Sequence, residues 1–298
     1  MLPLTVAWSR QTITRALESR FMMEELLGGA APLRHVFFTD PATVALADDM
    51  LIVILDGDGV ALLERARQAG IRRRGVFHMG DERGRHDLSF YQTADYVLRH
   101  YYHRAVFERD WGRPVAWMPN GYRNGVGPCD AALLLPASQR RQVSFFAGMV
   151  SGESAPVRQA MIDRIRSRSL PCDMYGSKEF GGGFPPAEYA GRLQDSVFGL
   201  CPPGQSTETI RIYDCLEHGT IPIVLAADYL NAAEAMAGAP FPVLSGWEDL
   251  DLWLGCHRDL GDPSVRRRLD DLQAACVSWW RTLKADRRAT VARLRGRP

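Results

Sequence analysis

Residues 197–225 read as strand, Gly/Pro loop, charged helix and strand, an order that few folds accommodate. The apolar segment 197–201 ends at a Pro-Pro-Gly turn, and Gly219 precedes the β-branched run 221–225. Pro and Gly interrupt regular structure, and Gly commonly closes a helix. A short, wholly apolar strand is typical of a parallel sheet that is buried on both faces. The segment therefore predicts one strand–helix–strand unit of such a sheet.

The same alternation of short strands and helices runs along the rest of the chain. Apolar runs predict strands at residues 4–8, 35–39, 51–55, 75–78, 96–98, 143–146 and 172–175. Helical spacing predicts helices at residues 10–27, 59–68, 155–168, 186–195 and 264–295. Alternating strands and helices favour an α/β protein with parallel sheets. The polar stretch 136–142 interrupts the series and predicts a division into two domains.

Composition limits the partners. The chain has 36 basic and 35 acidic residues, a net charge of +1, so we expect no nucleic-acid partner and only local anion sites. Six cysteines without CxxC pairs argue against structural zinc or a disulfide framework. The N-terminus lacks a secretion signal, and no stretch of about 18 apolar residues predicts a membrane span. We therefore expect a cytoplasmic protein, with peripheral membrane association left open.

The helix after the Pro-Pro-Gly turn has the side chains of an anion site. Glu208, Arg211 and Asp214 recur at intervals of three residues and share one face. Ser206 or Thr207 is expected to cap the helix, whose free N–H groups would suit a phosphate. Arg211 adds a fork of donors, and Asp214 can accept hydrogen bonds from sugar or ribose hydroxyls. The alternative is a set of ion pairs on a solvated helix face.

This segment resembles the donor-binding signature of the exostosin-type glycosyltransferases. That signature is an apolar strand, Cys-Pro-x-Gly, a Thr/Ser-rich turn and Arg-x-x-Glu-x-x-x-x-Gly-x-Ile-Pro-Val. Its Arg falls on Arg211, its Gly on Gly219 and its Ile-Pro on Ile221 and Pro222. Its Glu is replaced by Asp214, which is one methylene shorter.

Earlier segments are similar to the family in order and spacing, so that the likeness spans about residues 75–230. They are Gly80-Asp81-Glu82, Tyr96-Val-Leu-Arg99 with Tyr101-Tyr102, Met118-Pro-Asn-Gly-Tyr122 and Ser144-Phe-Phe-Ala-Gly148.

The resemblance implies a GT-B fold, in which two Rossmann-like domains face each other across a cleft and a C-terminal helix crosses back to the N-terminal domain. We expect an acceptor-binding domain at 1–135, a nucleotide-sugar-binding domain at 136–270 and the final helix at 271–298. The implied activity is inverting, metal-independent transfer from a nucleoside diphosphate sugar, with UDP as the expected nucleotide, to a hydroxyl of a glycan. The expected setting is bacterial polysaccharide synthesis, with no cofactor and no metal.

The donor residues follow from the same resemblance. Gly148 would let the phosphates approach the backbone, Tyr175 and Gly176 would stack on or cradle the base, and Glu208 would orient Arg211. The full expected donor set is Gly148, Tyr175, Gly176, Gly204, Ser206, Thr207, Glu208, Arg211 and Asp214.

The catalytic base is expected at the end of an N-terminal strand, because ligands bind beyond the carboxyl ends of parallel strands. Inverting transfer requires a group that takes the proton of the acceptor hydroxyl. Asp81 or Glu82 is the expected base. The expected acceptor contacts are His78, Arg99, Tyr102 and Asn120.

Two other functions stay open. The Asp56-Gly-Asp58-Gly turn could hold a divalent metal, as in a GT-A transferase, or supply the nucleophile of a haloacid-dehalogenase-type phosphatase. The replacement of Glu by Asp214 is compatible with a module that binds a glycan or a nucleotide sugar without turnover.

Overall fold

The computed structural model describes residues 3–28, 32–55, 57–178, 183–255 and 261–296. It divides into two compact units, each considered by itself below. Unit 1 comprises Met1–Asn120, Ala232–Ala235 and Leu283–Pro298, and unit 2 comprises Gly121–Asn231 and Met236–Thr282. The expected domain boundary was at residue 135, whereas unit 2 begins at Gly121.

The early start of unit 2 has a physical cause in the bonds of the segment that follows Asn120. Arg123 forms an ion pair with Asp214, and the N–H of Cys129 donates to Glu217. Both acceptors are buried side chains of the helix Arg211–Glu217. The segment therefore belongs with the second sheet.

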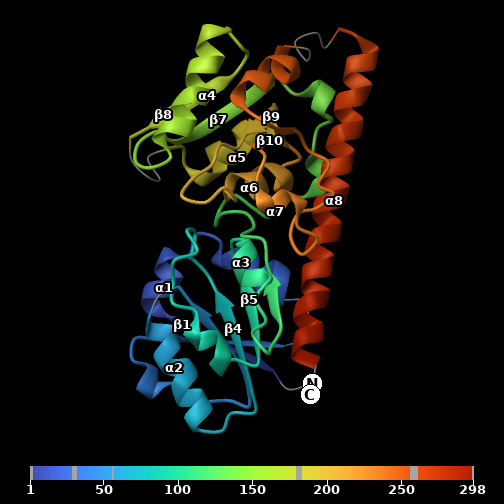
Figure 1. Cartoon of the computed structure of the whole chain (residues 1–298). Helices are drawn as coiled ribbons and strands as arrows, with labels where there is room; N and C mark the ends of the chain where they lie inside the picture. The colour runs from blue at the N-terminus through green and yellow to red at the C-terminus, as the bar shows by residue number, and fades with distance from the viewer. Residues whose placement is uncertain (1–2, 29–31, 56, 179–182, 256–260, 297–298) are drawn as a thin grey trace. The chain divides into compact units, whose positions relative to one another are not determined.

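Unit 1 is built on one parallel sheet, in which the described residues form six strands (Figure 1). They are β1 Leu4–Ser9, β2 Leu33–Phe38, β3 Asp49–Ile54, β4 Arg73–His78, β5 Tyr96–Arg99 and β6 Val115–Trp117. Their order across the sheet is β2-β1-β3-β4-β5-β6. Ile52 and Ile54 pack in one core cluster with Leu62 and Leu63 of helix α2. The intervening Leu51 and Val53 are also fully buried, so both faces of the sheet are covered.

Of the helices of unit 1, the one predicted at residues 59–68 is confirmed, the one predicted at 10–27 differs, and the short helix at 104–107 was not predicted. The helices of this unit are α1 Arg10–Arg15, the π-helix η1 Phe21–Leu27, α2 Gly57–Gln68 and α3 Arg104–Phe107, with short 3₁₀ turns η2 Pro41–Thr43 and η3 Ser89–Thr93. The single helix predicted over 10–27 is wrong, because the chain becomes extended at Ala16. Just before that point, the Thr14 hydroxyl donates to the carbonyls of Arg10 and Gln11. Such side-chain bonds compete with helix continuation.

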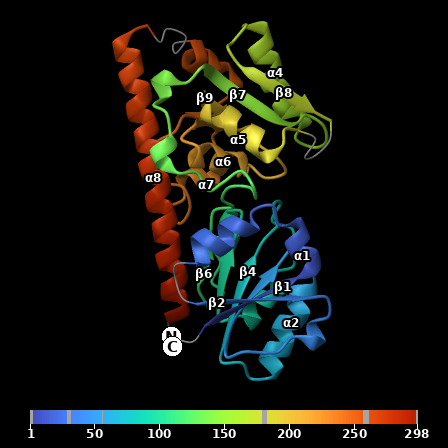
Figure 2. The same cartoon turned by 180° about the vertical axis from the view of Figure 1, so that it is seen from behind.

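Unit 2 carries the second parallel sheet, whose described residues form five strands (Figure 2). They are β7 Gln142–Met149, β8 Asp173–Ser177, β9 Ser196–Leu200, β10 Ile221–Leu225 and β11 Val243–Leu244. The order is β11-β10-β9-β7-β8, so β7 and β9 are neighbours although β8 separates them in the chain. The connection that follows β7 leads to β8 on one side of this pair, and the connection that follows β9 leads to β10 on the other side. The carboxyl ends of these two strands therefore form a topological switch point, where open α/β sheets bind ligands.

The helices of unit 2 follow the predicted strand–helix alternation. They are α4 Ala155–Ser167, α5 Pro186–Gln194, α6 Arg211–Glu217 and α7 Asp228–Asn231, with short turns η4 Ala131–Leu133, η5 Ala137–Gln139 and η6 Trp247–Asp249 and the π-helix η7 Asp251–Gly255. Gly219 ends α6 with φ +62°, the left-handed conformation that glycine adopts most easily.

Helix α8, Pro263–Gly296, is the last element and contributes to both units, as the sequence predicted for the C-terminal helix. In unit 2 its Trp280 ring packs on Tyr213, and the Trp280 indole N–H donates to Glu217 at 2.7 Å. In unit 1 the Arg295 guanidinium donates to Asp49 at 2.7 Å, at the start of β3. Among the described residues, no helix combines the length and the apolar character that a membrane crossing requires.

Replacing Arg295 with methionine is expected to destabilise unit 1. Arg295 is 2% exposed, so its removal leaves the largely buried carboxylate of Asp49 without its cation. Breaking a buried pair costs about 3–5 kcal/mol. Urea unfolding measures the loss, with Arg293→Met on the exposed side of the same turn as the control. Equal stabilities of the two variants would contradict the anchoring role.

Candidate functional site

The switch point of unit 2 gathers the signature loop and the end of β7. Arg211, the first residue of α6, directs its side chain back to this strand. Its Nε and Nη2 atoms donate to the carbonyl of Ala147 at 3.1 and 2.7 Å, and its guanidinium lies 5.0 Å from the Phe146 ring centroid. Its Nη1 atom is buried and has no hydrogen-bond partner among the described residues. Two of the three guanidinium nitrogens thus fix the side chain, and the third, Nη1, has N–H groups without a partner in the described part of the chain.

A second arginine that the sequence analysis did not single out lies at the same place. Arg158, on α4, is 7% exposed and donates from Nε to the carbonyl of Pro203 at 3.0 Å and from Nη1 to that of Met149. Its Nη2 atom would lie 3.4 Å from a Cβ at Gly204. Burial and the charge of Arg211 lower the pKa of Arg158 to about 10, so the Arg158 guanidinium remains charged at neutral pH.

The two guanidiniums form what we call the arginine pair. In the described part of the chain, neither Arg158 nor Arg211 has a carboxylate within ion-pair distance, unlike Arg123 in the same unit. Two neighbouring cations that have no anion nearby repel each other, and this repulsion favours the binding of an anion. Arginine forks match phosphate oxygens well. The arrangement is therefore suited to a phosphate group.

The glycine at the end of β7 is required by this packing. A Cβ at Gly148 would lie 2.3 Å from Arg211 Nη2, so a larger residue would displace the guanidinium from this position. Gly148 thus admits the arginine to the strand end. Direct approach of a phosphate to its backbone, the role expected from the sequence, would compete with Arg211 for the same space.

The loop before α6 is not the helix start that the sequence predicted. Helix α6 begins at Arg211, its cap residue is Ile210, and no side chain caps it. Ser206 Oγ accepts instead from the N–H of Glu208 at 3.1 Å, and the N–H of Gly204 donates to the Ser206 carbonyl at 2.9 Å. The capping role predicted for Ser206 or Thr207 is therefore wrong, because the Pro/Gly loop continues through a further turn. Thr207 is exposed on this loop.

The two carboxylates of the signature are buried and bonded to protein groups. Asp214 is 0% exposed, and its oxygens accept from the backbone N–H of Arg123 at 2.9 Å and from its Nε at 2.7 Å. Glu208 is 1% exposed and accepts from the Tyr213 hydroxyl at 2.5 Å. The predicted contact of Asp214 with sugar hydroxyls needs correction, since both oxygens are already used. Arg211 is oriented by the Ala147 carbonyl, which is not the contact with Glu208 that we expected.

Tyr175 and Gly176 lie on β8, the edge strand beside β7. They pair in register with Ala147 and Gly148, so they are one strand away from the arginine pair. The Tyr175 ring is 44% exposed and lies 4.7 Å from the Phe184 ring, centroid to centroid. An exposed aromatic ring at this edge is available for stacking on a base.

In unit 1 a buried network occupies the carboxyl ends of β4 and β5. The Arg99 guanidinium donates to Asp81 at 2.7 Å and lies 2.8 Å from His78 Nδ1. The backbone N–H groups of Arg85 and His86 donate to the other Asp81 oxygen at 2.7 and 3.1 Å. Burial alone would raise the pKa of Asp81, but the bond and charge of Arg99 outweigh it and hold that pKa at about 2. Asp81 is thus a weak base, and both of its oxygens already accept hydrogen bonds from the protein. These properties argue against it as the catalytic base.

Glu82 is the other expected base. It is half-buried, and burial together with the charge of Glu18 raises its carboxyl pKa. A raised pKa makes a carboxylate a stronger base. Glu82 therefore keeps the properties that the prediction requires.

The expected acceptor contacts are mostly inaccessible. His78 and Arg99 are 1% and 0% exposed inside the network, so they do not line an open groove. Asn120 is also fully buried, and within the described residues its amide group has no hydrogen-bond partner. Tyr102 is half-buried and stacks on Phe107 with ring centroids 5.0 Å apart.

Candidate metal ligands fall in the same network. Among the described residues, His78, Asp81 and His86 place one ligand atom each within 4.8 Å of one another. The cationic Arg99 donates to two of these side chains, which disfavours a second cation there. Of the alternative Asp-x-Asp site, Asp56 lies outside the described residues and Asp58 is half-buried in the first turn of α2.

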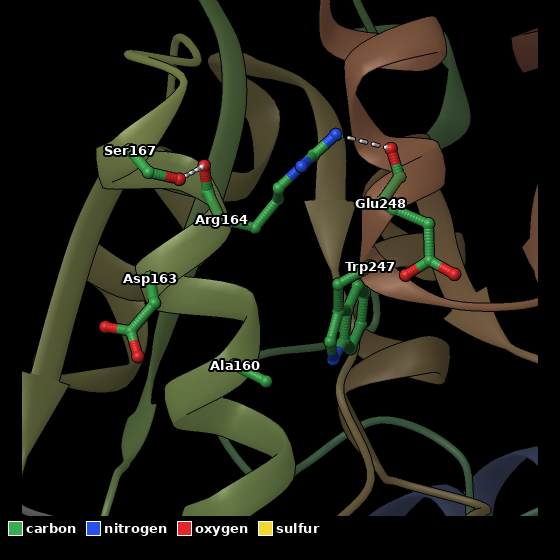
Figure 3. A pocket seen from close by; sticks show the side chains of 6 residues that line it. All are labelled: Ala160, Asp163, Arg164, Ser167, Trp247 and Glu248. Atoms are coloured by element: carbon green, nitrogen blue, oxygen red, sulfur yellow. Dashed lines mark hydrogen bonds between the residues drawn. The ribbon is translucent and has the colours of Figure 1, made fainter.

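A surface pocket of about 380 Å³ lies between α4 and η6 in unit 2 (Figure 3). Its lining residues are Ala160, Asp163, Arg164, Ser167, Trp247 and Glu248. Arg164 donates to the Glu248 carbonyl, and the Trp247 indole N–H donates to the Val157 carbonyl at 2.9 Å. These donors are already bonded within the protein, so this pocket offers less for anion binding than the arginine pair does.

Comparison with known families supports the predicted resemblance of unit 2 to glycosyltransferases. The sequence model of the Exostosin GT47 domain matches residues 128–237, which contain the arginine pair and the signature loop. The predicted resemblance to exostosin-type glycosyltransferases is therefore confirmed over these residues. The weaker motifs before residue 128 stay a prediction. No curated protein sequence gives a significant match.

Solved structures share the fold. An α-glucosyltransferase determined with UDP and a 13-mer DNA aligns with a TM-score of 0.57 at 11% identity, covering 94% of this chain and 95% of that one. An α1,3-fucosyltransferase aligns with a TM-score of 0.52 at 13% identity, covering 95% of this chain and 90% of that one. Identities this low establish the fold alone. It is the GT-B fold predicted from the sequence.

Proposed function

We propose that the protein transfers a sugar from a nucleoside diphosphate sugar to a hydroxyl of a glycan, with inversion at the anomeric carbon and without a metal. The observation that carries this proposal is the arginine pair at the switch point of unit 2. It supplies two fixed cations, with a buried and unsatisfied N–H group on Arg211, inside the residues that match the exostosin domain.

The chemistry explains why such a pair is useful. As the acceptor oxygen bonds to the anomeric carbon, the bond from that carbon to the phosphate oxygen breaks and negative charge develops on the diphosphate. Donors fixed in advance at the position of this charge lower the barrier without reorganisation. Arg158 and Arg211 are fixed by backbone carbonyls before any ligand arrives. They can therefore stabilise the leaving group without a cation.

The other donor contacts follow from position. Gly204 and Ser206 belong to the loop beside Arg158, and the exposed Thr207 can reach a phosphate from it. Tyr175, whose side chain is exposed, would stack on the base, with UDP as the expected nucleotide. A glycan acceptor and a role in polysaccharide synthesis are part of the proposal on the basis of the sequence resemblance, and a cytoplasmic location is part of it as expected from the apolar pattern of the sequence.

The burial of Asp214 weakens the alternative of a non-catalytic binding module. That alternative rests on a shortened carboxylate contact to the ligand. Both Asp214 oxygens are bonded to Arg123, so its length matters for packing and not for a ligand.

A thermal-shift panel tests the proposal. UDP, GDP, UDP-glucose, UDP-galactose, UDP-N-acetylglucosamine and UDP-glucuronate are compared with UMP, and each is measured with and without EDTA. A ligand at 100 times its Kd stabilises the native state by about 2.7 kcal/mol. We expect a diphosphate to raise Tm more than UMP does, with no effect of EDTA. An unchanged Tm with every diphosphate would refute the donor site, and a shift abolished by EDTA would favour the metal-dependent alternative.

A further inference from the structure

His103 lies where unit 1 is expected to perform acid–base chemistry. It follows β5 and directly precedes α3, at the carboxyl edge of the sheet, and its ring is half-buried. Its Nε2 atom lies 3.0 Å from the backbone carbonyl of Asp81. A carbonyl oxygen only accepts hydrogen bonds, so Nε2 must carry the hydrogen. In the neutral ring the lone pair is therefore on Nδ1.

The Nδ1 atom is free to take a proton. Among the described residues it has no hydrogen-bond partner, since the contact of the ring is made by Nε2. Gly84, with φ +64°, packs against the face of the ring, because a Cβ there would lie 3.0 Å from both Cγ and Nδ1. A glycine thus lets the imidazole ring lie close to the backbone at this position. Burial lowers the pKa of His103, and the charge of Arg99 lowers it further, so the ring is neutral near pH 7.

We propose that His103 is the general base of the transfer and that its Nδ1 takes the proton of the acceptor hydroxyl, an inference that rests on the proposed function. The acceptor oxygen bonds to the anomeric carbon as the bond from that carbon to the diphosphate breaks. The electron pair of that bond leaves with the diphosphate, and the proton moves to Nδ1. The Asp81 carbonyl keeps the imidazole oriented while it becomes cationic, and the nearby Asp81 carboxylate stabilises the new charge.

The neighbouring candidates are less suited to this role. Arg99 can only donate, so His78 Nδ1 accepts from it and His78 Nε2 carries a hydrogen. His78 Nε2 lies 3.1 Å from His86 Nδ1, which must then accept, so neutral His86 has its hydrogen on Nε2 and no free lone pair. Glu82 has a free carboxylate, but no hydrogen bond in the described residues fixes its orientation. A base whose orientation is fixed is the more effective one.

The test uses the full chain and hydrolysis of the UDP-sugar that gives the largest thermal shift, so water replaces the unknown acceptor. His103→Gly is expected to lower kcat for UDP release by about 10²- to 10⁴-fold, the usual contribution of a general base. The thermal shift by UDP and KM should stay close to wild type, because the donor residues are in unit 2. Added imidazole should restore a large part of the lost rate.

Further variants separate the possible outcomes. His103→Gln keeps a hydrogen-bond donor of similar size and should lose the rate without rescue by imidazole. His35→Gln, on edge strand β2, is the control, with wild-type rate and no response to imidazole. Wild-type kcat in both His103 variants, or loss of kcat only in Glu82→Gln, would overturn the role of His103. A wild-type protein that neither binds UDP nor releases it from any UDP-sugar would instead refute the proposed function itself.

Discussion

Arg211→Ala is expected to remove most of the stabilisation by nucleoside diphosphates. The Arg211 guanidinium is held on the end of β7 by the Ala147 carbonyl and has a buried, unsatisfied Nη1 group. A hydrogen bond to a charged group contributes about 1.5–3 kcal/mol, which corresponds to a roughly 10- to 100-fold weaker Kd when it is lost. Isothermal titration with UDP measures the change.

The second member of the arginine pair should behave in the same way. Arg158→Met keeps an unbranched side chain in the same buried space but removes the guanidinium, and we expect a comparable loss of UDP affinity. Arg166→Met, on the exposed side of the same helix α4, is the matched control and should bind UDP like wild type. Binding unaffected by both Arg158→Met and Arg211→Ala would exclude the arginine pair as the donor site.

Asp214→Asn should cause the largest loss of stability among the variants in unit 2. The side chain is fully buried, and both of its oxygens bind Arg123, so the substitution leaves the half-buried Arg123 guanidinium without its anion. Breaking a buried pair costs about 3–5 kcal/mol. Urea denaturation measures the loss in the free energy of unfolding. Part of this loss would come from weaker packing of the segment after Asn120.

Two comparisons isolate the Asp214 pair. Asp173→Asn disrupts an exposed pair with Arg192 and should cost at most about 1 kcal/mol. The double variant Arg123→Met with Asp214→Asn should cost less than the sum of the single changes, because the partners interact. If Asp214→Asn were as stable as wild type yet bound UDP-sugars poorly, the original prediction of a sugar contact would be restored.

The elements of the fold follow closely from local sequence. The apolar runs predicted at 51–55 and 221–225 appear as β3 and β10, and the helix predicted at 264–295 appears as α8. Such predictions succeed because burial on both faces of a parallel sheet demands continuous apolar strands. They fail where side-chain bonding competes with the backbone, as in the segment from Arg10 to Leu27 and in the loop before α6.

Only one of the two arginines of the anion site could be predicted from the sequence. Arg211 could be recognised because it belongs to a signature with fixed spacing. Arg158 looks like any charged residue on an amphipathic helix, and its burial depends on the Pro203 and Met149 carbonyls that surround it. A buried arginine four residues into the first crossover helix has no pattern of its own.

The sequence by itself determined the alternation of strands and helices, because local periodicity and turn residues carry that information. The GT-B class came from the resemblance of the signature loop to the exostosin-type glycosyltransferases. Only the tertiary structure decided which polar groups lie near each other: Arg158 with Arg211, Arg123 with Asp214, and the His103 ring with the Asp81 carbonyl. These partners lie far apart in the chain and are brought together by the crossovers of two parallel sheets. The energy of a charge depends on the groups around it, so the assignment of each role had to wait for the fold.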